Sequence, residues 1–112
     1  MRIFLLSVPP AYNRTGCFLF ETRPTFTYID NVYREDYNDW KADVFPQMIV
    51  GCAALAWRRG FDLFGVEFWG VCWAGYRGLD YTVDGPMPDG NRSGCLHEIG
   101  AEDRAISVFE FQ

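Results

Sequence analysis

The chain has few of the residues from which catalytic and metal sites are usually built. His97 is the only histidine, so the sequence contains neither a histidine cluster nor an H-E-x-x-H zinc motif. The G-x-S-x-G, Walker A and G-x-G-x-x-G motifs are also missing. No two cysteines form a C-x-x-C pair, which excludes zinc-ribbon and thioredoxin-type sites. We therefore expect no catalytic residues, no metal site and no cofactor.

Basic residues and long apolar runs are scarce as well. The ten Lys and Arg residues are outnumbered by fifteen Asp and Glu residues, giving a net charge of −5. Because phosphate binding needs a basic face, we exclude a nucleic-acid partner. No apolar run approaches the length of a membrane span. The apolar stretch at residues 2–8 ends at Pro9-Pro10 without a small-residue cleavage site, so we interpret it as a β-strand and not as a signal peptide.

Aromatic residues, in contrast, are abundant. They make up 18% of the 112 residues. A chain of this length forms one hydrophobic core, so we predict a single domain over residues 1–112. One small core does not enclose so many rings, and some of them are expected on the surface.

Cysteines and glycosylation sequons indicate an oxidising compartment. An even number of cysteines in a short chain is typical of disulfide-bonded secreted proteins, and here the four are Cys17, Cys52, Cys72 and Cys95. Two N-glycosylation sequons, beginning at Asn13 and Asn91, lie beside glycines in surroundings typical of turns. The sequence therefore predicts a secreted, extracellular protein with two disulfides and with glycans at Asn13 and Asn91.

The hydrophobic pattern predicts one main helix between two groups of strands. Residues 46–59 have apolar residues at helical spacing, and Gly60 is suited to end the helix. Strands are predicted at 2–8, 16–20, 25–29, 64–68 and 105–111, with glycine- and proline-rich loops between residues 69 and 95. This order predicts an α+β fold in which one helix packs on an antiparallel sheet, with the apolar runs 2–8 and 105–111 as neighbours.

The segment that follows the strand at 64–68 contains the candidate binding residues. Flat aromatic rings stack on the C–H faces of sugars, whereas carboxylates and arginines form hydrogen bonds with hydroxyl groups. The same residue types also anchor protein partners. The candidates for ligand binding are Glu67, Trp69, Trp73, Tyr76, Arg77, Asp80 and Tyr81. An alternative for Trp69 and Trp73 is that they flank a disulfide and pack over it.

The acidic segment 30–39 is rich in oxygen ligands of the type that calcium binds. It lacks the spacing of an EF-hand loop. A solvated charged surface is the simpler interpretation, and calcium binding stays open.

Several short segments resemble the core of WSC-like and PAN/apple-like extracellular domains, over about residues 16–112. They are Gly16-Cys17-Phe18, Cys52-Ala53-Ala54, Arg59-Gly60-Phe61, Phe64–Phe68, Cys72–Gly75 and Val108–Phe111. The resemblance implies a helix cradled by an antiparallel sheet, and binding of carbohydrate or protein. Full WSC domains carry further cysteines, one of them where this chain has Ala74, so the chain is similar to a reduced, four-cysteine form.

Four cysteines allow three pairings. We favour Cys52–Cys72, from the helix to the end of the next strand, together with Cys17–Cys95. The function that we expect is a non-enzymatic carbohydrate-binding or adhesive module, whose partner is a glycan or an extracellular protein. The alternative is a structural subunit of an extracellular filament or matrix, which self-associates through its terminal strands and aromatic patches.

Overall fold

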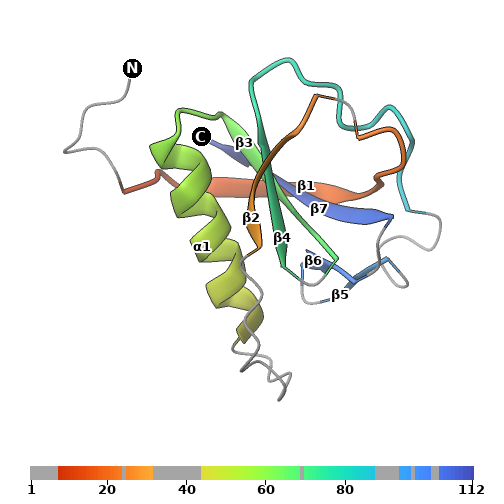
Figure 1. The fold of residues 1–112 in the computed structure, drawn as a ribbon, viewed down its shortest axis with the longest axis horizontal. Helices are drawn as coiled ribbons and strands as arrows, with labels where there is room; N and C mark the ends of the chain where they lie inside the picture. The colour runs from red at the N-terminus through yellow and green to blue at the C-terminus, as the bar shows by residue number, and fades with distance from the viewer. Residues whose placement is uncertain are drawn as a thin grey trace.

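The computed structural model describes residues 8–23, 25–31, 44–68, 70–87, 94–96, 98–101 and 104–112. Its elements, drawn in Figure 1, are β1 (Tyr12–Leu19), β2 (Thr27–Asn31), α1 (Val44–Arg58), β3 (Leu63–Glu67), β4 (Val71–Gly75), β5 (Cys95–Leu96), β6 (Ile99–Gly100) and β7 (Ala105–Phe111). Five of these strands form one sheet in the order β1-β7-β3-β4-β2, and every neighbouring pair is antiparallel. The predicted α+β architecture, a helix on an antiparallel sheet, is confirmed.

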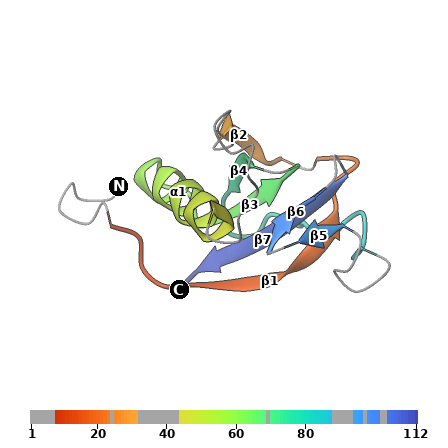
Figure 2. The same cartoon turned by 90° about the horizontal axis from the view of Figure 1, so that it is seen from below.

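The sheet is covered on both faces. Helix α1 lies over one face, which we call the helix face (Figure 2), and its apolar residues pack there against Phe64 and Val66 of β3. The opposite face, which we call the loop face, carries a second apolar cluster built around Phe20, Leu63 and Ile106. Because β3 lies between two cores, all five of its residues are buried.

Helix α1 ends as its sequence predicts. Gly60 has a positive φ of 88°, which glycine adopts without strain. Its N–H donates to the carbonyl of Trp57 (3.0 Å), and the N–H of Phe61 donates to the carbonyl of Ala56 (3.1 Å). This pair of bonds is the Schellman motif, which satisfies carbonyls that the end of the helix leaves free.

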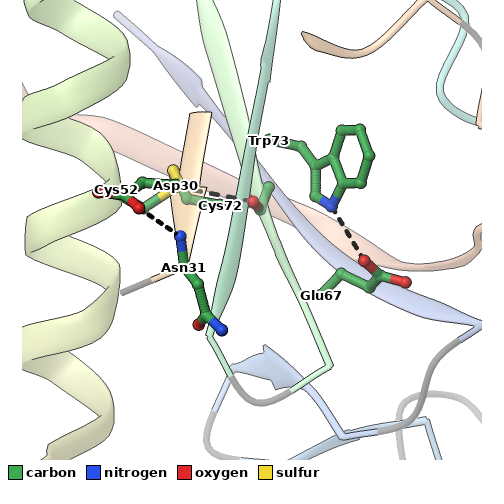
Figure 3. Close-up of a disulfide and its surroundings, with 7 residues drawn as sticks. Asp30, Asn31, Cys52, Glu67, Cys72 and Trp73 are labelled. Carbon is green, nitrogen blue, oxygen red and sulfur yellow. Dashed lines mark hydrogen bonds between the residues drawn. A yellow bond between two sulfur atoms is a disulfide. The ribbon is translucent and has the colours of Figure 1, made fainter. Parts of the chain in front are cut away.

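Both predicted disulfides form. Cys52 of α1 is bonded to Cys72 of β4, with their Cα atoms 5.5 Å apart, and Cys17 of β1 is bonded to Cys95 of β5. The Cys52–Cys72 bridge lies between the helix and the sheet (Figure 3), where both residues are fully buried.

Strand β4 was expected to be a loop, and that prediction is wrong. The glycines that flank Cys72 suggest turns, but Gly75 lies inside a strand. A Cβ at Gly75 would come within 2.5 Å of the Leu79 side chain and 3.2 Å of the Leu63 side chain. A side chain at position 75 would thus displace Leu79, so Gly75 allows this close packing at the end of the strand.

Two further strand predictions need correction. The strand expected at 64–68 ends at Glu67, because Phe68 has a positive φ of 41° and turns away as a half-exposed residue. The strand expected at 16–20 begins earlier, at Tyr12, and continues through a bulge between Arg14 and Gly16. Asn13 consequently lies in a strand and not in a turn.

The expected pairing of the first and last apolar runs is also wrong. Residues 2–7 lie outside the described residues, and Val8 is not part of a strand. Strand β7 pairs with β1 on one side and with β3 on the other, so both of its edges are occupied.

We expect the two disulfides to contribute unequally to stability. They close loops of 20 and 78 residues, for which loop-closure entropy gives about 3 and about 4.5 kcal/mol respectively. Replacing Cys52 and Cys72 together by alanine should thus reduce the free energy of unfolding by less than replacing Cys17 and Cys95. Urea denaturation of the two double variants without reductant measures both losses. Equal losses would show that packing around Cys52–Cys72 adds to the entropic term.

Candidate functional site

A small pocket on the loop face brings two of the predicted binding residues together. Its volume is about 40 Å³, and it is lined by Asp62, Leu63, Arg77, Gly78, Leu79, Tyr81 and Glu110. The lining comes from three places in the chain: the start of β3, the segment after β4, and the end of β7. Arg77 and Tyr81 were predicted from the sequence, whereas Asp62 and Glu110 were not.

Strand register places the acidic side of the pocket. Leu63 and Glu110 are direct partners in the antiparallel β3–β7 ladder, so their side chains lie next to each other on the same face. Asp62 is held beside them, because its N–H donates to the carbonyl of Gly75 (3.0 Å) and its carbonyl accepts from the N–H of Phe111 (3.1 Å). Its carboxylate accepts a hydrogen bond from the backbone N–H of Arg77 (2.8 Å), which fixes the opposite wall.

The Tyr81 hydroxyl is held inside the pocket by a carboxylate. It donates a hydrogen bond to Oε2 of Glu110, and its ring packs edge-on against Phe18 with centroids 5.2 Å apart. Burial raises the pKa of Tyr81, as do the hydrogen bond to Glu110 and the charge of that carboxylate, while a hydrogen bond with Thr15 opposes the rise. The phenol therefore keeps its proton at neutral pH and acts as a hydrogen-bond donor.

Glu67, at the other end of β3, interacts with Trp73 of the neighbouring strand β4. Glu67 is only 3% exposed. Its Oε1 accepts from the indole Nε1–H of Trp73 (2.9 Å), as Figure 3 shows, and its Oε2 accepts from Nη2 of Arg23 (2.9 Å). Both carboxylate oxygens are thus used inside the protein, and the arrangement holds the segment around Arg23 against the sheet.

Trp73 points away from the disulfide beside it in sequence. Cys72 faces α1, whereas the Trp73 ring lies on the loop face, edge-on to Phe20 (5.2 Å) and Tyr28 (5.7 Å). The alternative that Trp73 packs over the disulfide is therefore wrong (Figure 3). The guanidinium of Arg23 lies 4.6 Å from the ring centre of Phe20 and 5.4 Å from that of Trp73.

The remaining candidates do not join the pocket. Tyr76 is 60% exposed and packs on Phe61, which belongs to the core of the helix face. Asp80 accepts hydrogen bonds from the N–H (3.1 Å) and hydroxyl (2.7 Å) of Thr82, so it stabilises the turn that leads into Tyr81. Asn13 is exposed on β1. Trp69 and Asn91 lie outside the described residues.

Sequence reasoning missed Asp62, Glu110 and Arg23 for a common reason. Each acts through a residue far along the chain, so that no local motif connects the partners. Arg23 and Glu67, for example, are 44 positions apart. The strand at 105–111 was predicted, and knowledge of its register with β3 would have identified Glu110.

The part of the chain that the structure describes contains no evident metal site. Among those residues, no group of three or more His, Cys, Asp or Glu side chains is placed to hold a metal ion. Of the acidic segment considered for calcium, only Asp30 and Asn31 are described, and the Asp30 carboxylate accepts the N–H of Asn31 (2.8 Å). In the same part of the chain, no helix has the length and apolar character needed to cross a membrane.

We expect replacement of Arg23 by methionine to destabilise the protein by about 3 kcal/mol, because it leaves the buried Glu67 charge without its cation. Arg104→Met is the matched control, since the Arg104–Glu21 pair is exposed on both sides and such pairs contribute about 0–1 kcal/mol. Thermal or urea unfolding of both variants measures the difference. Equal effects would contradict a structural role for the Arg23–Glu67 pair.

The ionisation of Tyr81 gives a second prediction. A tyrosine whose pKa is higher in the folded than in the unfolded protein stabilises the fold fully below about pH 10 and loses that contribution as the pH rises through the folded pKa. Replacing Glu110 by Gln removes the charge and should lower the Tyr81 pKa toward 10.0. Alkaline absorbance titration, with a Tyr81→Phe variant to subtract the other five tyrosines, measures this shift. An unchanged pKa would contradict the interaction with Glu110.

Comparison with known proteins adds no further assignment. No family model matches the chain, and neither a curated protein nor a solved structure matches it.

Proposed function

We propose that this protein is a secreted, non-enzymatic module that binds carbohydrate through the pocket between Asp62, Arg77, Tyr81 and Glu110. The observation that supports the proposal best is the mixture of groups in that pocket. Two carboxylates, one guanidinium and one protonated phenol surround Leu63 and Leu79. The resemblance to WSC-like and PAN/apple-like domains leads to the same proposal.

These groups have the chemistry that sugar recognition needs. Neighbouring hydroxyls of a sugar both donate and accept hydrogen bonds, so a site for them needs acceptors and donors close together. The carboxylates accept, while Arg77 and the Tyr81 hydroxyl donate. The two leucines offer an apolar surface to the C–H groups of the ring. A volume of about 40 Å³ admits the edge of one sugar ring and not a whole oligosaccharide, so we propose a weak site that gains strength by repetition.

The state of Tyr81 supports binding over catalysis. A tyrosine that acts as a nucleophile has to lose its proton, and the pKa of Tyr81 is shifted in the opposite direction. A protonated hydroxyl held by Glu110 is suited to donate a hydrogen bond to a ligand once the ligand displaces or shares that contact.

The disulfides support the proposed location. Two buried disulfides and no free cysteine among the described residues fit an oxidising, extracellular environment.

The alternative, a self-associating structural subunit, has less support. It relies on terminal strands with free edges. Strand β7 has none, whereas β1 lies at the edge of the sheet. The observation that favours self-association is the exposure of three aromatic side chains, Tyr28 (52%), Phe68 (50%) and Tyr76 (60%). Aromatic residues of this type anchor protein interfaces. Light scattering over a range of concentrations distinguishes the two: a monomer favours carbohydrate binding, and ordered oligomers favour assembly.

An array of neutral, amino-substituted and acidic oligosaccharides tests the proposed function. Tyr81→Phe removes a hydrogen-bond donor, and Glu110→Gln removes the charge and replaces one acceptor oxygen by an NH2 donor. We therefore expect each variant to bind about five- to tenfold more weakly the oligosaccharides that the unmodified chain binds. Tyr76→Phe and Glu21→Gln are the matched controls, because they make the same chemical changes at exposed residues outside the pocket and should leave binding unchanged. Equal losses in both pairs, or no binding by the unmodified chain, would contradict the proposal.

A further inference from the structure

Asn13 lies beside the pocket, although 97 residues separate it from Glu110 in the chain. The two residues are direct partners in the antiparallel β1–β7 ladder. Opposite side chains in such a ladder share a face, and their Cβ atoms are about 5 Å apart. Glu110 lines the pocket on the loop face, so Asn13 extends the pocket's rim along β1.

The residues on either side of Asn13 agree with this orientation. The ring of Tyr12 packs edge-on against Phe64 and Phe109 of the helix-face core, so Asn13, one residue later, faces the opposite side of the sheet. Two positions beyond Asn13, Thr15 lies close enough to the Tyr81 hydroxyl to lower its pKa.

The amide of Asn13 is presented in a way that suits modification. Its Oδ1 accepts a hydrogen bond from Nε2 of Gln112 (3.1 Å), which fixes the plane of the amide. Its Nδ2, the atom that carries an N-linked glycan, has no partner among the described residues, and the side chain is exposed. Asn13-Arg14-Thr15 is a complete sequon.

We propose that N-glycosylation of Asn13 controls access to the pocket. A glycan on Nδ2 is attached to a side chain whose Cβ lies about 5 Å from that of Glu110. The first sugar of the glycan is larger than the pocket. It covers the rim from the β1 side and offers hydroxyls to the same Tyr81 and Glu110 groups that an external sugar would use. The glycosylated chain therefore binds external carbohydrate more weakly than the unglycosylated chain. This inference rests on the proposed function of the pocket.

The test uses the full chain secreted from a eukaryotic host in two forms. Asn91→Gln removes the other sequon and leaves Asn13 as the glycan site, while the double variant Asn13→Gln/Asn91→Gln carries neither glycan. Intact mass establishes the occupancy of Asn13. Binding of both forms is measured on the oligosaccharide array described above. If the glycan leaves the pocket open about a tenth of the time, the apparent affinity of the glycosylated form falls about tenfold.

Trimming the Asn91→Gln protein with an endoglycosidase that leaves one sugar provides a second measurement, and we expect it to restore part of the binding. Equal binding by the glycosylated and unglycosylated forms would overturn the inference while leaving the proposed function intact. An unmodified Asn13 in the secreted protein would overturn it as well. Absence of binding by the unglycosylated form would instead refute the carbohydrate-binding function, and the inference would fall with it.

Discussion

The antiparallel pairing of β3 with β7 is the constraint on which the rest of the structure depends. It places Phe64 opposite Phe109 toward α1 and Leu63 opposite Glu110 on the other face, so a single ladder organises both cores. Phe64 and Phe109 stack with centroids 4.9 Å apart beneath the helix, and the pocket opens where Leu63 and Glu110 meet. A slip of one residue in this register would exchange the two faces, burying Glu110 under the helix and dissolving the pocket.

Local patterns in the sequence were sufficient for the elements that depend on local chemistry. Helical spacing with a glycine at its end predicts α1 to within two residues at its start, and the apolar run 105–111 predicts β7 with its observed bounds. The disulfide pairing favoured among the three possible ones is the pairing observed. Strand β4 was missed because the sequence alone does not distinguish a glycine that makes room for a neighbouring side chain from a glycine that forms a turn. Gly75 is of the first kind, since a Cβ there would clash with Leu79.

The candidate site was predictable only in part, since its members come from distant strands. Arg77 and Tyr81 are close in sequence and were chosen for their chemistry, whereas Asp62 and Glu110 join them through sheet register alone. Glu67 illustrates the reverse problem. Its charge suggested a ligand contact, but the strand is buried on both faces, and Arg23 and Trp73 occupy both of its oxygens.

The position of β7 also has a consequence for the route by which the protein folds. Strands β3, β4 and β2 form one ribbon through pairings within residues 27–75, while β1 joins the sheet through its ladder with β7, which lies between β1 and β3. The ladder partner of Tyr12 is therefore Phe111, which lies 99 residues later in the chain. Closing so long a loop is entropically costly, and sheets dominated by such contacts fold slowly. Without β7, β1 and β3 would each have an unpaired edge, and unpaired strand edges favour aggregation, so β7 also protects the two strands beside it.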